Sequence, residues 1–291
     1  MISAELVKEL REKTGAGIMD CKKALVECNG DMEKSLDYLR EKGIAKATKK
    51  ADRIATEGLA NIYVSGNKAV ILEVNSETDY VSKNEEFISM LDEIGNAILN
   101  SDAKDYESAL NVKTNNGTVS ELIVAKISKI GEKLSFRRCE IITKADDEVF
   151  GKYLHLGGRI AVLSVLKGAN EDVARDVAMQ AAAMRPKYVF SSEVPESVLE
   201  REKNVFKEQA INEGKPADIA EKMVAGRVNK FYKEVCLADQ DFIKESGVSV
   251  SKYVANNGGE IKLVVRYEVG EGMEKKSENF AEEVMNQVNG K

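Results

Sequence analysis

Residues 68–98 read KAVILEVNSETDYVSKNEEFISMLDEIGNAI, and within this stretch the apolar pattern changes from that of a strand to that of a helix. Residues 68–75 form an apolar, β-branched run that predicts a buried strand. The apolar residues after it recur at helical spacing: Phe87, Leu91, Ile94 and Ile98. Ser82 and Glu85 fit a capping box, which predicts the start of this helix. Residues 73–85 are therefore expected to connect a strand to a helix.

The order hairpin, helix, helix, strand is predicted twice along the chain. In the first half, the two hairpin strands, the second helix and the last strand are expected at 60–64, 68–75, 119–130 and 134–142. In the second half, the hairpin strands are expected at 149–154 and 159–166 and the last strand at 260–268. The helices between them are expected at 171–184 and 250–255. The pattern predicts an α+β fold, with residues 56–143 and 144–269 as two related subdomains of antiparallel strands and helices.

Two further helical parts lie outside this repeated pattern. Residues 1–55 predict three short helices, the third closed by Gly43, and so small a unit favours a module that docks on a partner. Residues 195–236 predict two amphipathic helices joined at Glu213-Gly214-Lys215, which indicates a helical hairpin or short coiled coil. This hairpin either adds a layer to the core or reaches out to a partner.

Composition excludes several classes of protein. Charged residues make up 32% of the 291 residues, but the net charge is −6 and no basic patch stands out, so direct nucleic-acid binding is not expected. The chain has no apolar run of 18 residues, and its first residues carry charges at helical spacing, so neither a membrane span nor a signal peptide is predicted. We expect a cytoplasmic protein.

Sequence motifs of enzymes are scarce. The chain lacks a Walker motif and a strand followed by GxGxxG, and its carboxylates show no metal-ligand spacing. None of the four cysteines forms a CxxC pair, so zinc sites and disulfides are not expected. The remaining enzymatic reading pairs Cys139 with His155, the single histidine, in thiol or hydrolytic chemistry. We therefore predict a protein that is not an enzyme and needs no cofactor or metal.

The connection at residues 73–85 contains two apolar residues, Tyr80 and Val81, where a surface loop needs none. Two interpretations of the tyrosine are open. Its ring packs into the core beneath the loop, or Asp79 and Tyr80 together enter another protein.

Four stretches of the chain resemble signature regions of the elongation factor Ts family, in the same order and from end to end. They are TGAGIMDCKKAL at 14–25, EVNSETDYVSK at 73–83, GKPADIAEKM at 214–223 and IKLVVRYEVGEG at 261–272. The resemblance implies a guanine-nucleotide exchange factor that binds elongation factor Tu with GDP and promotes GDP release. The rival interpretation is a helical interaction scaffold without exchange activity.

The resemblance also implies roles for individual residues. Asp79 and Tyr80, framed by Thr78 and Val81, would enter the GTPase and dislocate its magnesium ion; the family usually has phenylalanine where Tyr80 stands. Further partner contacts are implied at Ile18, Met19, His155 and Phe280. The last of these falls in residues 270–291, which resemble a C-terminal helical module.

Overall fold

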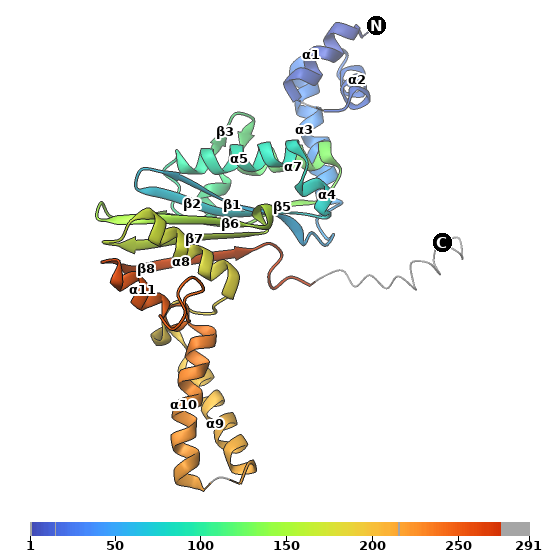
Figure 1. Ribbon diagram of the computed structural model, residues 1–291. Helices are drawn as coiled ribbons and strands as arrows, with labels where there is room; N and C mark the ends of the chain where they lie inside the picture. The colour runs from blue at the N-terminus through green and yellow to red at the C-terminus, as the bar shows by residue number, and fades with distance from the viewer. Residues whose placement is uncertain (1, 15, 215, 275–291) are drawn as a thin grey trace. The chain divides into compact units, whose positions relative to one another are not determined.

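The computed structural model describes residues 2–14, 16–214 and 216–274. They form helices and small antiparallel sheets, which confirms the mixed composition expected of an α+β fold (Figure 1). The chain divides into two compact units. The first combines residues up to Tyr63 with Leu72–Ile141 and the described residues from Glu268 onward, and the second comprises Val64–Ile71 and Ile142–Tyr267.

The first unit begins with three helices: α1 (Ala4–Thr14), α2 (Ile18–Glu27) and α3 (Met32–Thr48). The Ser3 hydroxyl accepts a hydrogen bond from the Leu6 N–H at 3.2 Å, and Asp31 caps α3 through the Lys34 N–H at 3.1 Å. These caps satisfy donors that the first helical turn leaves without partners. The three helices share a small core formed by Leu10, Cys21, Ala24 and Leu25.

The predicted end of the third helix at Gly43 is wrong, because α3 continues through this glycine to Thr48. Gly43 is buried, and a Cβ added there would lie 3.8 Å from the Val124 side chain and 3.9 Å from Ser128. Both neighbours belong to α7 (Val119–Ile130). A small residue in mid-helix thus lets α3 pack closely on α7, and this tertiary contact outweighs the local stop signal.

The first sheet has the strand order β1-β2-β5, and its strands are β1 (Glu57–Ser65), β2 (Lys68–Ser76) and β5 (Leu134–Thr143). Two helices lie over it, α5 (Glu85–Leu99) and α7. The predicted capping box is wrong, because Asn84 caps α5 through the Glu86 N–H at 2.8 Å. Ser82 instead ends a separate short helix, α4 (Asp79–Ser82). Gly131 closes α7 with a φ of 87°, as predicted.

The polar stretch between α5 and α7 contains short elements that the sequence did not predict. They are α6 (Tyr106–Leu110), β3 (Lys113–Thr114) and β4 (Gly117–Thr118). The two strands pair with each other as a separate two-stranded sheet.

The second unit is built on a sheet with the order β6-β7-β8, and its strands are β6 (Glu148–His155), β7 (Ile160–Lys167) and β8 (Glu260–Glu268). β6 and β7 pair in an antiparallel register from Glu148 opposite Lys167 to His155 opposite Ile160. The short 3-10 helix η1 (Leu156–Gly158) connects them. Helix α8 (Glu171–Met184) packs on β6 and β7.

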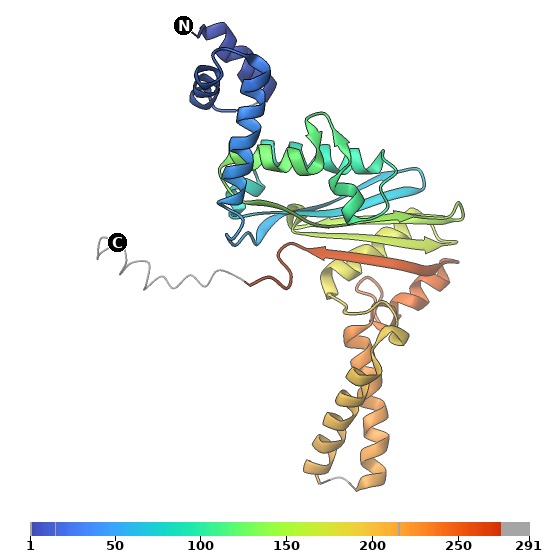
Figure 2. The same ribbon diagram turned by 180° about the vertical axis from the view of Figure 1, so that it is seen from behind.

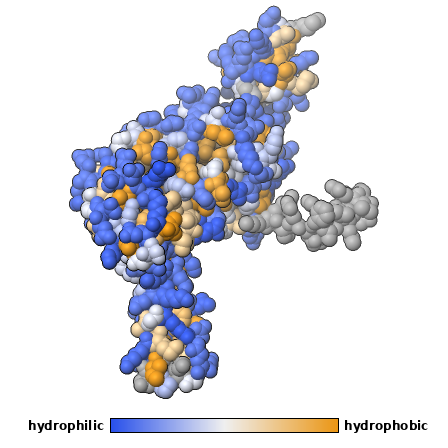
Figure 3. All heavy atoms as spheres, viewed as in Figure 1, coloured by the Kyte–Doolittle hydropathy of each residue, from blue (hydrophilic) through white to orange (hydrophobic). Residues whose placement is uncertain are grey.

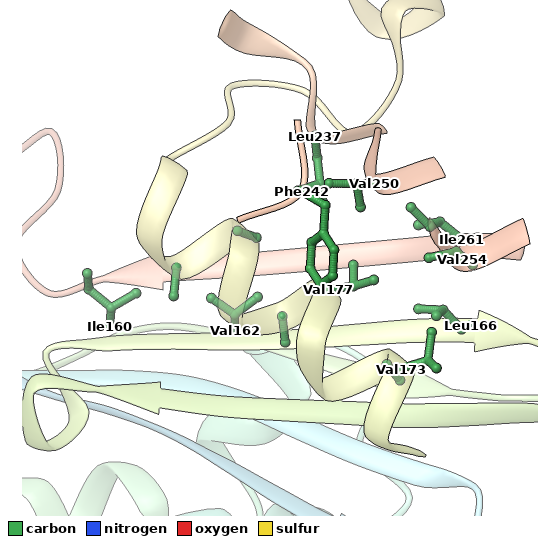
Figure 4. Packing of buried hydrophobic residues seen from close by; sticks show 14 residues of the cluster. Ile160, Val162, Leu166, Val173, Val177, Leu237, Phe242, Val250, Val254 and Ile261 are labelled. Atoms are coloured by element: carbon green, nitrogen blue, oxygen red, sulfur yellow. The ribbon is translucent and has the colours of Figure 1, made fainter. Parts of the chain in front are cut away.

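The core of this unit lies between α8, the sheet and the chain that follows the long helices. Figure 4 shows the ring of Phe242 pointing toward Val177 of α8, and the ring stacks on Tyr253 with centroids 4.0 Å apart. Close contact between α8 and β6 depends on Gly151, since a Cβ there would lie 2.1 Å from the Ala174 carbonyl carbon. This distance leaves room for hydrogen only.

Two long helices, α9 (Glu196–Asn212) and α10 (Ala217–Val235), lie side by side in both views of the ribbon (Figures 1 and 2). Arg227 of α10 donates hydrogen bonds to Gln209 at 2.9 Å and to Glu213 at 3.0 Å. Ala210 is the buried residue of α9, while Val198 and Leu199 pack, partly buried, against a small core cluster at the base of the two helices. The shorter η2 (Ser191–Glu193), η3 (Leu237–Asp239) and α11 (Val250–Asn256) complete the unit. Within the described ranges, no helix combines the length and the apolar character that crossing a membrane requires.

Candidate functional site

The loop between β2 and α5 presents Tyr80 to the solvent. Its side chain is 79% exposed, more than any other large hydrophobic residue that the structure describes. The interpretation in which this ring packs into the core is therefore wrong. Val81 takes the inward position instead, at 6% exposed, and Asp79 lies on the surface beside Tyr80. The chain thus displays an acid and an aromatic ring together on one turn.

The four-residue helix α4 owes its shape to local hydrogen bonds. Thr78 has extended backbone angles (φ −125°, ψ 154°), and its hydroxyl oxygen accepts from the Val81 N–H at 3.4 Å. The Ser82 hydroxyl donates to the Asp79 carbonyl at 2.8 Å, and the Ser76 hydroxyl donates to the Thr78 carbonyl at 2.9 Å. Because Ser76, Val81 and Ser82 are buried, they hold the turn from beneath while its outer residues remain accessible.

Asp79 forms an ion pair with Lys83, one helical turn further along. The lysine Nζ lies 2.6 Å from the aspartate Oδ2, and the side chains are 73% and 61% exposed, respectively. Exposed pairs of this kind contribute little to stability, because water solvates both charges well when they separate. The carboxylate is therefore held near the turn but can exchange this ion pair for another contact at small cost.

Glu132 supports the turn from a distant part of the sequence. Its two carboxylate oxygens accept from the Thr78 N–H at 3.0 Å and from the Thr78 hydroxyl at 2.7 Å. Sequence reasoning missed this residue, because the two positions are 54 residues apart and share no motif. The only local signal was the glycine at position 131, which predicts that the chain turns just before Glu132.

A second carboxylate, Glu73 on β2, is fully buried. It accepts hydrogen bonds from Arg137 at 2.9 Å, from Arg138 at 2.6 Å and from the Gly270 N–H at 2.9 Å. Burial by itself raises the pKa of the Glu73 carboxyl, but the Gly270 N–H and the two guanidinium groups outweigh it, so this pKa lies below its usual value. Glu73 thereby joins β2, β5 and the segment after β8 through its hydrogen bonds and ion pairs.

The other predicted contact residues lie on separate elements. Ile18 and Met19 begin α2 and are 54% and 74% exposed, and Figure 3 shows apolar side chains among polar ones on the N-terminal helices. In the second unit, His155 ends β6, half-buried, with its ring 6.1 Å from that of Tyr153. Phe280 lies outside the described residues.

The pKa of the Cys139 thiol does not support the alternative in which Cys139 and His155 carry out thiol chemistry. Burial, followed by the nearby charges of Asp105 and Glu140, raises the pKa of Cys139 to about 12. A nucleophilic cysteine requires the opposite shift, since the thiolate is the reactive form. No cluster of three or more potential metal-ligating side chains occurs among the residues that the structure describes.

Comparison with known proteins identifies similar sequences. The family model "Elongation factor TS" matches residues 77–271, a range that begins just before the Thr78–Val81 turn. The chain is 54% identical over 288 residues to elongation factor Ts of Limosilactobacillus fermentum (strain NBRC 3956 / LMG 18251), covering 99% of each sequence.

Proposed function

The chain belongs to the elongation factor Ts family, and on this premise we propose that it releases GDP from the GTPase elongation factor Tu in translation elongation. The observation that carries the proposal is the exposed pair Asp79 and Tyr80 on a turn whose base is buried. In this role the two side chains enter the GTPase near its magnesium and phosphate site. The exchange involves no covalent step and consumes no part of the factor.

The physical basis of exchange is negative coupling between two ligands of the GTPase. The factor and GDP each weaken the binding of the other by the same factor. A weakening of about 10⁴-fold requires about 5.5 kcal/mol of differential binding. Displacing magnesium is a suitable source of this energy, because the ion neutralises the dense negative charge of the phosphates.

Asp79 and Tyr80 supply complementary parts of this energy. The ring of Tyr80 is a large surface that water covers in the free chain, so burying it against the GTPase favours association. Asp79 brings a negative charge. Its carboxylate separates from Lys83 and competes for those groups of the GTPase that otherwise interact with the magnesium ion and the phosphates. The Tyr80 hydroxyl must find a hydrogen-bond partner in the complex, since an unpaired buried hydroxyl costs about 1–3 kcal/mol.

The proposal includes a wider interface and a finer architecture. Ile18 and Met19, with Phe280 and His155, are further contact residues for elongation factor Tu. Residues 1–55 and 270–291 are helical modules, the second largely outside the described residues; residues 56–143 and 144–269 are related subdomains, and residues 195–236 form a coiled coil. The cytoplasm is the proposed location.

The decisive experiment follows the release of fluorescent GDP from elongation factor Tu with and without the chain, at several magnesium concentrations. We expect the wild type to accelerate release strongly, and the double variant Asp79→Ala/Tyr80→Ala to lose most of this acceleration. Tyr80→Phe should retain it. Asp102→Ala, which removes an exposed aspartate outside the loop, is the matched control.

Two outcomes would contradict the proposal in different ways. A wild-type chain that binds the GTPase without changing the dwell time of GDP would be a scaffold and not an exchange factor. A double variant as active as the wild type would leave exchange in place but remove Asp79 and Tyr80 from its mechanism.

A further inference from the structure

Two segments of the first unit exchange hydrogen bonds through their carboxylates. Glu77 accepts from the Lys133 N–H at 2.6 Å, while Glu132 accepts from the N–H and the hydroxyl of Thr78 at 3.0 and 2.7 Å. Each segment thus offers a carboxylate to the backbone of the other. We name these four residues (Glu77, Thr78, Glu132 and Lys133) the reciprocal clamp.

A third segment, the chain after α3, is tied to the same clamp. The Lys133 ammonium group donates to the carbonyl oxygens of Ala51 at 2.6 Å and Arg53 at 2.8 Å. The Arg53 guanidinium group in turn donates to Glu77 at 3.2 Å. The clamp therefore joins three stretches of chain at the N-terminal end of the turn that carries Tyr80.

The clamp acts on the residue that controls the direction of this turn. Thr78 is the N-cap of α4, and Asp79 and Tyr80 follow it immediately. A helix of four residues has almost no stability of its own, so contacts at its ends must set its orientation. Buried Val81 and Ser82 hold its C-terminal end, and Glu132 holds its N-terminal end through Thr78.

The position of Glu132 argues against a role in general stability. Thr78 is exposed and Glu132 is half-buried, so neither side chain belongs to the hydrophobic core. Loss of these hydrogen bonds opens no cavity, because water can take the place of the carboxylate. The consequence should be confined to the order of the turn.

We propose that Glu132 is a positioning residue for nucleotide exchange: by holding Thr78, it preorganises Asp79 and Tyr80 for entry into the GTPase. The inference rests on the proposed exchange function and adds to it a residue outside the matching motif. A preorganised turn does not have to be ordered during association, so more of the contact energy is available to weaken nucleotide binding.

The test compares Glu132→Ala, Glu132→Gln and the wild type in GDP release from elongation factor Tu at saturating factor. Removing two hydrogen bonds from a charged acceptor should lower the maximum release rate roughly five- to tenfold. Glutamine keeps one acceptor oxygen and should restore part of the rate. Glu107→Ala, on an exposed position of α6, is the matched control and should release GDP like the wild type.

A second measurement reports on the turn itself. The chain has no tryptophan, so Tyr80→Trp places a single indole on the turn. Combining this change with Glu132→Ala should give faster local depolarisation of the indole fluorescence, with a melting temperature within about 2 °C of the parent. Combining it with Glu107→Ala should leave the depolarisation unchanged.

The outcomes separate this inference from the function on which it rests. A wild-type chain that accelerates release, together with an equally fast Glu132→Ala at saturation, overturns the positioning role and leaves exchange intact. The inference also fails if Glu132→Ala slows GDP release and strongly lowers the melting temperature, while the depolarisation of the indole at position 80 stays the same. A wild-type chain without exchange activity overturns both proposals.

Discussion

Replacing Glu73 by glutamine tests the charged centre of the first unit. The substitution keeps the volume of the side chain, so it creates no cavity, but it removes the charge that faces Arg137 and Arg138. The carboxylate is fully buried, whereas the arginine side chains are 23% and 29% exposed and retain some contact with water. Breaking a buried ion pair costs about 3–5 kcal/mol, and the partial solvation of both arginines favours the lower end, about 3 kcal/mol.

The effect should depend on pH in a definite direction. The pKa of Glu73 is lower in the folded chain than its usual value of about 4.3. A lowered pKa contributes stability that is present above the unfolded pKa and is lost as the pH falls through the folded value. The difference in the free energy of unfolding between the wild type and Glu73→Gln should therefore have its full size at pH 7 and become smaller below about pH 4.

Urea unfolding at a series of pH values measures this difference directly. Glu107→Gln, which changes an exposed glutamate on α6, is the control and should match the wild type. A Glu73→Gln variant within about 0.5 kcal/mol of the wild type at pH 7 would refute the reasoning. A destabilisation that stays constant from pH 7 to pH 3 would equally show that charge is not its cause.

Three further predictions concern packing and thiol reactivity. Gly43→Ala should raise the free energy of unfolding by up to about 1 kcal/mol, since the nearest atoms are at ordinary contact distance and alanine favours a helix; a lower melting temperature would contradict this. Gly151→Ala should lower the free energy of unfolding by about 1–3 kcal/mol or more, because the new methyl group collides with the Ala174 backbone. Calorimetry of Gly43→Ala and Gly151→Ala should therefore show opposite shifts in melting temperature. Cys139 should react with a thiol reagent at pH 8 far more slowly in the folded chain than in urea, since burial raises its pKa to about 12; equal rates in both states would show that it is accessible.

The elements with a long, regular apolar period could be predicted well from the sequence. Residues 171–184 were expected to form a helix, and α8 has these bounds. The errors occur where a tertiary contact competes with a local signal. Gly43 resembles a helix end in isolation, but the close approach of α7 uses it in mid-helix. Ser82 fits a capping pattern, yet its burial draws it into a separate turn and leaves the cap to Asn84.

The sequence predicts that residues 73–85 connect a strand to a helix, and β2 and α5 confirm this order. The direction of the Tyr80 ring does not follow from the sequence. That direction depends on which neighbours are buried, and local chemistry does not contain this information. The supporting carboxylate of Glu132 and the arginine and glycine partners of Glu73 come from 54 to 197 residues away, where no sequence period connects them.

The bond between Glu73 and Gly270 has a consequence for how the molecule is made. The two residues are separated by 197 positions, and the first unit includes the described residues from Glu268 onward. During synthesis the early strands and helices emerge long before this segment does, while the second unit can begin to fold in the interval. One hydrogen bond to the buried acid of the amino-terminal half can therefore form only after residue 270 has left the ribosome.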